Sequence, residues 1–289
     1  MKVFWVFLFF CIALIWGSVM SIIKILLLEY SPIELIILRL SIATLVVMPY
    51  LIIKRPKIHK KDRIWFVVTA ILLYPVYQLG LVMGETQVNA GLAGLILAFT
   101  PILATFFSFL FFKEDLNQKQ IVGFVISIIG MAILCGISSI FQDFNAYVLW
   151  ILVAVFAGAI ALNFEKSLLK RYSVLDVLPI CIFIGGIWAV FFLPSVAGKF
   201  IASSYVNQGL VLYLAILPII VGHTLMAFVV KDFSMKLASS VMFVVPIVSL
   251  GFAWLLLGEI PNTVQLLGAA AVFVGIFFVV FPKNQKLKS

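Results

Sequence analysis

Ten long apolar stretches, separated by short polar segments, run through this chain of 289 residues. Each is close to the roughly 20 residues that a helix needs to cross a hydrocarbon layer of about 30 Å. The stretches are continuously apolar rather than alternating, which argues against the strands of a membrane barrel. The pattern therefore predicts an all-α integral membrane protein with ten transmembrane helices. The predicted helices cover residues 4–28, 34–53, 64–84, 90–112, 119–138, 146–170, 175–194, 210–230, 238–258 and 262–281.

A set of residues recurs 145 positions later along the chain. The recurring pairs are Pro101 and Pro246, Glu114 and Glu259, Asn117 and Asn262, Gly123 and Gly268, and Gly130 and Gly275. Because this spacing is half of the chain, we interpret the sequence as two copies of one five-helix unit. The first half covers residues 1–140 and the second half covers residues 141–289. Two joined copies of one apolar unit are typical of secondary transporters.

The basic residues orient these helices, because cytoplasmic loops carry an excess of Lys and Arg. With the N-terminus inside, the inner segments contain 17 of the 20 basic residues, six of them between Lys54 and Arg63. The outer segments contain only Lys199, whereas Lys24 and Arg39 lie within spans. Both termini are therefore expected in the cytoplasm. Each half then has five spans, an odd number, so the two halves must be inverted relative to each other.

Composition supports a membrane protein and excludes other classes. Apolar residues make up 65% of the chain and charged residues 11%, far from the balance of a soluble domain. The net charge of +9 does not indicate nucleic acid, because the basic residues lie in short loops where they orient the chain and touch membrane lipid. The apolar N-terminus is interpreted as an uncleaved first span. Without a glycosylation sequon or an extracellular disulfide pattern, a bacterial plasma membrane (the inner membrane) is the simplest location.

Several of these residues together resemble the EamA family of the drug/metabolite transporter (DMT) superfamily. The resemblance rests on Trp16-Gly17-Ser18 with Lys24, on Arg39, and on the doubled prolines, glutamates and glycines in order. It implies ten helices around a central cavity. It also implies secondary transport of small organic solutes such as amino acids, metabolites or drugs, usually outward. The second half departs from the pattern, with Ala157-Gly158 in place of Trp-Gly and Cys181 near the position of an Arg39 partner.

The two mid-span prolines are candidate hinges. Proline removes a backbone donor, so Pro101 and Pro246 deprive the carbonyls of Leu97 and Met242 of their helical partners. We expect each helix to kink there and to shape the cavity for alternating access. A static kink that packing tolerates is the alternative.

Three of the ionisable side chains within the predicted spans are functional candidates, namely Arg39, Glu165 and His223. A charge such as Arg39 in the hydrocarbon costs about 3 kcal/mol or more unless it is paired or hydrated. Arg39 is therefore expected to face the cavity or to pair with backbone carbonyls or an acid, for which Glu165 is a candidate by elimination. Glu165 and His223 are candidates for proton coupling. The alternatives are a hydrated pair of Glu165 with Lys166, and a hydrogen-bonded structural histidine.

Aromatic and amide side chains at similar depth form the predicted solute site. Aromatic faces with a few hydrogen-bonding groups suit a small amphipathic solute. Most of the aromatic residues, among them 28 Phe, are expected to pack helices or face lipid. Tyr, Trp and Gln are better candidates because each has a polar group. The predicted solute-binding residues are Trp16, Ser18, Tyr74, Tyr77, Gln78, Asn163 and His223.

Glu114 and Glu259 each lie 13 residues after the proline of their helix, at the membrane boundary, where a helix-end anchor or salt bridge is expected. Each is followed by Asn-x-x-Gln, which predicts a capping box at Asn117 and at Asn262. The pair Gly80 and Gly84 predicts close helix approach.

Two other classes compete with a transporter. A membrane-embedded transferase would need a nucleophile with a base, or a metal cluster, and neither is visible with only His59 and His223. A channel or receptor usually lacks an inverted internal repeat. No phosphate-binding loop, cofactor motif or metal-ligand spacing is present, so no cofactor or metal is expected. The sequence leaves open a coupling proton and a homodimer.

Overall fold

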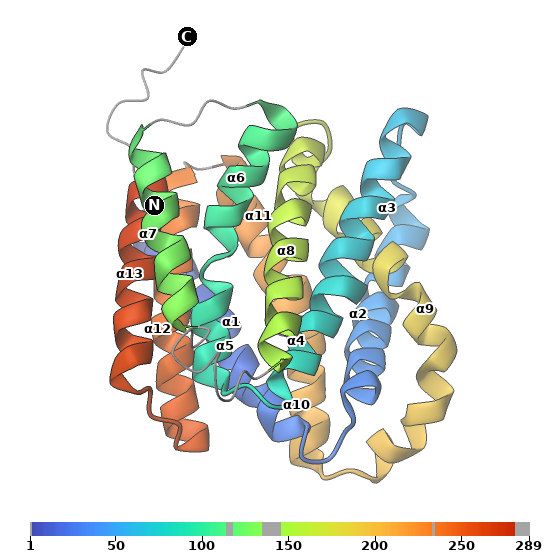
Figure 1. The fold of residues 1–289 in the computed structure, drawn as a ribbon. Helices are drawn as coiled ribbons and strands as arrows, with labels where there is room; N and C mark the ends of the chain where they lie inside the picture. Colours follow the sequence, from blue (N-terminus) through green and yellow to red (C-terminus); the bar gives the residue numbers. More distant parts are fainter. Residues whose placement is uncertain (1, 114–117, 135–145, 233–234, 281–289) are drawn as a thin grey trace.

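The computed structural model describes residues 2–113, 118–134, 146–232 and 235–280, and every regular element in these ranges is a helix. Figure 1 shows a bundle in which most helices run along a common direction. In the first half the elements are α1 (Lys2–Leu26), α2 (Pro32–Lys54), η1 (Lys60–Asp62), α3 (Arg63–Ile71), η2 (Leu72–Val76), α4 (Tyr77–Glu85), α5 (Ala90–Leu97), α6 (Thr100–Phe112) and α7 (Gln118–Leu134). In the second half they are α8 (Tyr147–Leu169), α9 (Val174–Ala202), α10 (Tyr205–Ile216), η3 (Leu217–Gly222), α11 (His223–Asp232), α12 (Met235–Leu257) and α13 (Thr263–Val280).

Six helical segments of the described chain are long and apolar enough to cross a membrane. They are Pro32–Lys54, Lys60–Glu85, Ala90–Phe111, Tyr147–Leu169, Val174–Ala202 and Tyr205–Val229. Four apolar helices are shorter, namely Phe10–Leu26, Gln118–Ile133, Val244–Leu257 and Thr263–Phe278. Each of these segments overlaps a stretch that the hydrophobic pattern predicts, although several of them extend beyond its predicted ends.

The second helix of each half begins with a serine N-cap, which in α2 is part of a reciprocal capping box. The hydroxyl of Ser31 accepts the N–H of Glu34 at 3.3 Å, and the Glu34 carboxylate accepts the N–H of Ser31 at 2.7 Å. Ser173 likewise accepts the N–H of Asp176 at 3.1 Å. These bonds satisfy backbone donors that the first helical turn leaves free. They therefore fix where α2 and α9 start, immediately after a short connection.

Helix α9 is longer than the sequence pattern predicts. The expected helix ends at residue 194, whereas α9 continues through Pro194 to Ala202. A proline within a helix bends it rather than ending it when the flanking turns are held by other contacts. Lys199, beyond the proline, forms an ion pair of 2.7 Å with Glu34 at the start of α2, and Figure 1 shows the bent ribbon.

Helices α7 and α13 pack closely through the repeated glycines. A Cβ added at Gly130 would lie 2.8 Å from the carbonyl oxygen of Gly268, and one at Gly275 would lie 2.6 Å from that of Gly123. Only glycine allows two backbones to approach in this way. Residue numbers rise along α7 as their partners fall along α13, so the two helices are antiparallel. They lie side by side in Figure 1.

Helices α2 and α9 form a second antiparallel pair. Glu34 meets Lys199 at one end, and the hydroxyl of Thr44 donates to the carbonyl of Ile182 at 3.5 Å farther along. A Cβ at Gly186 would meet the side chain of Thr44. The first and second halves of the chain are therefore joined by two antiparallel helix pairs, α2 with α9 and α7 with α13.

The predicted close approach at Gly80 and Gly84 is confirmed. A Cβ at Gly80 would lie 2.6 Å from the carbonyl oxygen of Trp150 and 2.7 Å from the nitrogen of Ala154, both on α8. A Cβ at Gly84 would meet the side chain of Ile151. The two glycines thus let α4 pack directly on the backbone of α8.

Candidate functional site

One π-helical turn interrupts the helical segment Lys60–Glu85, and a second interrupts the segment Tyr205–Val229. They begin at Leu72 and at Leu217, which are 145 residues apart, the same spacing as in the sequence repeat. Each contains a proline, Pro75 or Pro218. Proline cannot donate to the preceding turn, and π turns are common at functional sites. The two halves thus widen a helix at matching positions.

Aromatic rings from both halves meet beside these turns. The Trp16 and His223 ring centroids lie 5.4 Å apart, and those of Tyr74 and His223 lie 6.4 Å apart, both edge to face. The Trp16 indole N–H donates to the carbonyl of Pro218 at 3.3 Å. The structure therefore brings together three of the predicted solute-binding residues, from α1, η2 and the start of α11. We refer to Trp16, Tyr74 and His223 as the aromatic cluster.

Ser18 on α1 connects the two halves of the chain through Tyr213, a residue that the sequence analysis did not single out. Its hydroxyl is 2.7 Å from the phenol oxygen of Tyr213 on α10, and it also donates to the carbonyl of Ile15 at 3.0 Å. Tyr213 is one of eight tyrosines and stands in no motif. Only the folded chain shows that it faces Ser18.

Arg39 is almost completely buried, with 1% of its surface exposed. Its Nε and Nη1 have no hydrogen-bond partner in the part of the chain that the structure describes. Tyr77 is close enough to interact with it electrostatically. No ion pair joins Arg39 to Glu165. Arg39 is therefore within electrostatic range of a predicted solute-binding tyrosine, and two of its guanidinium nitrogens have no partner among the described residues.

Two predicted amide side chains have different surroundings. Gln78 is 3% exposed, and its Oε1 has no partner among the described residues. Asn163 donates to the carbonyls of Ala104 at 2.8 Å and Ala159 at 3.0 Å, so its amide ties α8 to α6. The Gln78 oxygen can accept a bond from a solute, whereas the donors of Asn163 are already in use.

Glu165 is a buried acid on α8. It is 7% exposed and interacts electrostatically with Tyr74 and Cys181. Cys181 is fully buried on α9. The Glu165 carboxyl group is thus within electrostatic range of Tyr74, one member of the aromatic cluster, and no hydrogen bond joins these two residues.

The two mid-span prolines differ in the structure. At Pro101 the helix is broken: α5 ends at Leu97 and α6 begins at Thr100, whose hydroxyl donates to the carbonyl of Leu97 at 2.7 Å. This is the carbonyl that the proline was expected to free. At Pro246, in contrast, α12 continues without a break. The predicted kink therefore has a clear counterpart only in the first half.

The helix-end role predicted for Glu259 is confirmed. Its carboxylate accepts the N–H of Gly91 at 3.2 Å, in the first turn of α5. The capping box at Asn262 is confirmed as well, because Asn262 and Gln265 exchange bonds of 2.8 and 3.0 Å. Glu114 and Asn117 lie outside the described residues.

A polar network that the sequence did not predict joins the halves at the basic end of the bundle. Asp62, which is 3% exposed, accepts bonds from Arg171 at 2.5 Å and from the phenol of Tyr172 at 2.7 Å. The backbone N–H of His59 donates to the Tyr172 phenol oxygen at 3.1 Å, and the ammonium group of Lys231 donates to the Tyr172 backbone carbonyl at 3.0 Å. Burial and the bond to Asp62 raise the pKa of Tyr172. The network fastens the connections after α2 and α8 to each other and to the last turn of α11.

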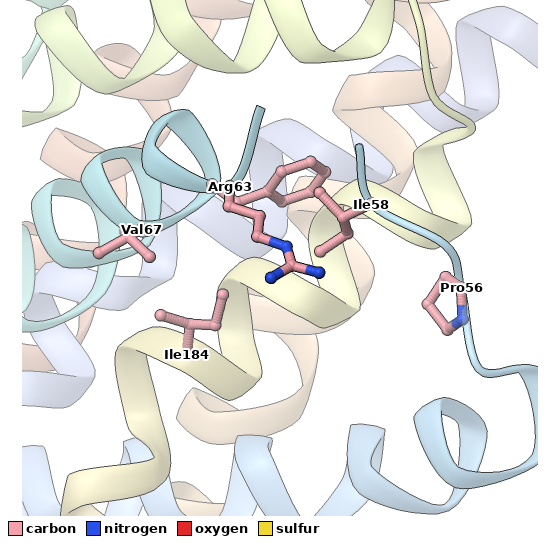
Figure 2. A pocket seen from close by; sticks show the side chains of 6 residues that line it. Pro56, Ile58, Arg63, Val67 and Ile184 are labelled. Carbon is pink, nitrogen blue, oxygen red and sulfur yellow. The ribbon is translucent and has the colours of Figure 1, made fainter. Parts of the chain in front are cut away.

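A hollow of about 390 Å³ lies away from the aromatic cluster, between the start of α3 and the side of α9. Figure 2 shows the Arg63 guanidinium extending into it. Its lining is formed by Pro56, Ile58, Arg63, Phe66, Val67 and Ile184. None of the predicted solute-binding residues contributes to it.

Comparison with known proteins shows similarity to membrane transporters. The EamA-like transporter family matches residues 3–136 and 145–281. The chain is 26% identical over 275 residues to the uncharacterized transporter YdfC of Bacillus subtilis, covering 95% of this chain and 90% of that protein.

Two further relatives have names that state a cargo. A probable terminal-alkyne amino-acid exporter of Streptantibioticus cattleyicolor is 26% identical, over 70% of this chain and 68% of its own. A probable amino-acid metabolite efflux pump of Salmonella typhimurium is 27% identical, over 66% and 68%. One crystal structure shares the fold with a TM-score of 0.61 at 16% identity, covering 94% of both chains.

Proposed function

The chain belongs to the EamA-like transporter family, and on that basis we propose that it is a secondary transporter that exports small organic solutes by alternating access. It is a multi-pass membrane protein, and six helical segments of the residues that the structure describes are long and apolar enough to span a bilayer. Relatives named as an amino-acid exporter and an amino-acid metabolite efflux pump support outward movement and a solute of the size of an amino acid. A bacterial plasma membrane is the proposed location.

The proposed architecture is ten crossing segments, arranged as two inverted repeats of five, residues 1–140 and 141–289. The reciprocal glycine contacts carry this proposal. Gly130 meets Gly268, and Gly275 meets Gly123, so that each contact is repeated with the halves exchanged. A two-fold axis produces such pairs, and antiparallel packing of equivalent helices is what inversion requires. Inverted halves can open to either side at similar energy, which is the basis of alternating access.

The proposed orientation has both termini in the cytoplasm. It rests on the basic residues, of which 17 of 20 then lie in cytoplasmic segments. The network around Asp62 would lie at the inner end of the bundle, and the ion pair of Glu34 with Lys199 at the outer end.

The proposed solute site is centred on the aromatic cluster. Trp16 and Tyr74 offer ring faces, and the Tyr74 hydroxyl and the Gln78 oxygen have no partner among the described residues. The free guanidinium nitrogens of Arg39 suit a carboxylate. An amphipathic carboxylic acid, such as an amino acid with an apolar side chain, would use all of these groups. Ser18, Tyr77, Asn163 and His223 complete the proposed lining.

Counterflow tests this function directly. The purified chain is reconstituted into liposomes loaded with one unlabelled L-amino acid, and uptake of the same radiolabelled amino acid is followed for a panel of apolar and polar amino acids. A carrier exchanges label for unlabelled solute and shows a transient accumulation of label. Liposomes without protein are the control. Absence of exchange across amino acids, their metabolites and common drugs would overturn the proposal, and it is the result expected of a membrane-embedded transferase.

A further inference from the structure

The hollow between α3 and α9 has the composition of a site for an amphipathic ligand, and the solute site does not use it. Five of its six lining residues are apolar, and the sixth is Arg63, whose guanidinium extends into the hollow in Figure 2. Its volume of about 390 Å³ lies in the range of small-molecule pockets. An apolar wall with one cation suits a ligand in which an anionic group is joined to an apolar chain.

No acidic side chain among the described residues neutralises Arg63. Its neighbour Asp62 is buried and accepts bonds from Arg171 at 2.5 Å and from the Tyr172 phenol at 2.7 Å. The Arg63 guanidinium itself has no hydrogen bond or ion pair in the part of the chain that the structure describes. The hollow therefore offers a free guanidinium, a group that binds phosphate through two parallel N–H bonds.

The connection that borders the hollow carries an excess of positive charge. Residues 54–63 contain six Lys and Arg and one acid, Asp62. All six basic side chains are exposed, whereas Asp62 is buried. The connection between α9 and α10, which has the equivalent place in the second half, consists of Ser203 and Ser204 and has no charge. The surroundings of the hollow thus favour an anion over a neutral or zwitterionic ligand.

Exposed apolar residues place the hollow at the boundary of the membrane. Ile52 and Ile53, at the end of α2, are 55% and 81% exposed, and Ile64 and Trp65, at the start of α3, are 58% and 41% exposed. In a membrane protein such side chains face hydrocarbon, and Trp is enriched at the level of the lipid headgroups. The basic residues of the connection lie between these two pairs. A phospholipid has its phosphate at this level and its acyl chains beside the exposed apolar surface.

We propose that the hollow is a binding site for one anionic phospholipid. Arg63 holds the phosphate, and the glycerol backbone and the first methylene groups of one acyl chain pack on Phe66, Val67 and Ile184. Because Ile184 belongs to α9 and the other lining residues belong to the first half, the lipid ties the two halves together at this end. The lipid is a structural ligand and takes no part in solute binding, so the proposal does not depend on the identity of the solute.

Native mass spectrometry, which counts bound lipids, tests the site. The purified chain in an uncharged detergent is titrated with phosphatidylglycerol, or with phosphatidylcholine that has the same acyl chains. The first phosphatidylglycerol should bind about tenfold more tightly than phosphatidylcholine. Arg63→Gln should weaken its binding by about tenfold or more, because a charge-assisted bond to the phosphate is lost.

Lys57→Gln is the matched control for the charge. It removes an exposed cation of the same connection that does not line the hollow. Binding of phosphatidylglycerol should weaken by less than about fivefold, the effect of one charge near a membrane surface. Equal losses in Arg63→Gln and Lys57→Gln would show a diffuse basic surface in place of a site in the hollow, and would overturn the proposal.

Ile184→Trp tests the apolar wall without changing a charge. The larger side chain fills the hollow, so binding of phosphatidylglycerol should fall to the level of Arg63→Gln. Wild-type binding in a folded Ile184→Trp protein would exclude the hollow as the place of the acyl chain. If this variant does not fold, the comparison of Arg63→Gln with Lys57→Gln still decides the proposal.

Thermal unfolding provides a second measurement. Phosphatidylglycerol at about a hundred times its dissociation constant should raise the unfolding temperature of the wild type by about 5 °C and leave that of Arg63→Gln nearly unchanged. Inorganic phosphate is the control for the headgroup alone and should neither displace the lipid nor stabilise the protein. Displacement by inorganic phosphate at a similar concentration, or equal affinity of the wild type for the two lipids, would contradict an anionic phospholipid as the ligand.

Discussion

Buried polar groups without partners are the main residue-scale feature of this interior. The Tyr74 hydroxyl, the Gln78 oxygen and two Arg39 nitrogens are buried and unpaired in the described part of the chain. A protein usually satisfies such groups, because each costs about 1–3 kcal/mol when left unpaired. A carrier has a physical reason to keep them, since the solute supplies the missing partners when it binds.

Arg39→Lys separates a carboxylate clamp from a mere positive charge. Lysine keeps the charge and loses the planar fork of donors that matches a carboxylate. We expect the solute concentration for half-maximal counterflow to rise about ten- to a hundredfold, which corresponds to about 1.5–3 kcal/mol for a hydrogen bond to a charged group. Arg63→Lys, at the exposed hollow beside α3, is the matched control and should behave as the wild type. Unchanged kinetics in Arg39→Lys would contradict the clamp.

At the scale of elements, helix interruptions and glycine contacts shape the bundle. The π turns η2 and η3 stand at matching places in the two halves, and the break between α5 and α6 has no matching break in α12. Equivalent helices pack closely where glycine removes the side chain. The two halves therefore share the π turns and the glycine contacts, but only the first half has a helix break at its mid-span proline.

Pro101→Ala tests the break as a hinge. The new N–H can bond to the Leu97 carbonyl, which Thr100 now caps, so α5 and α6 can join into one helix. Counterflow should slow by about tenfold, equivalent to roughly 1.4 kcal/mol on the opening step, while the protein remains folded. Pro246→Ala should have a smaller effect because α12 already runs through that position. Wild-type rates in Pro101→Ala would remove the hinge from the account.

Gly130→Ala tests the packing of α7 on α13. The added Cβ would lie 2.7 Å from the backbone nitrogen of Val272, which cannot move without separating the helices. We expect a loss of about 1–3 kcal/mol, measured as a lower unfolding temperature of the purified protein in detergent. Gly198→Ala is the control, because no atom lies within 4 Å of its Cβ in helix α9. That change should be neutral or stabilise by up to about 1 kcal/mol. Equal stability changes in the two variants would contradict a packing role specific to Gly130.

At the scale of the whole molecule, the sequence predicts the helices well because their signal is local. Runs of apolar residues marked the spanning segments, and the doubled glycines marked the repeat but did not show that α7 packs on α13. Tyr213 was missed because its importance comes from a neighbour far along the chain, Ser18. The π turns were missed for another reason: Pro75 and Pro218 show that a helix is disturbed but not in what way.

The relative orientation of the halves is the central claim, and cysteine accessibility tests it most directly. Lys57, between α2 and α3, and Tyr205, at the start of α10, are exposed and lie in equivalent connections of the two halves. Each is changed to Cys in a protein without native cysteines and treated with a membrane-impermeant maleimide in intact cells and in everted vesicles. We expect Tyr205→Cys to react in intact cells and Lys57→Cys only in everted vesicles. Labelling of both positions from the same side would contradict inversion and, with it, alternating access between two inverted halves.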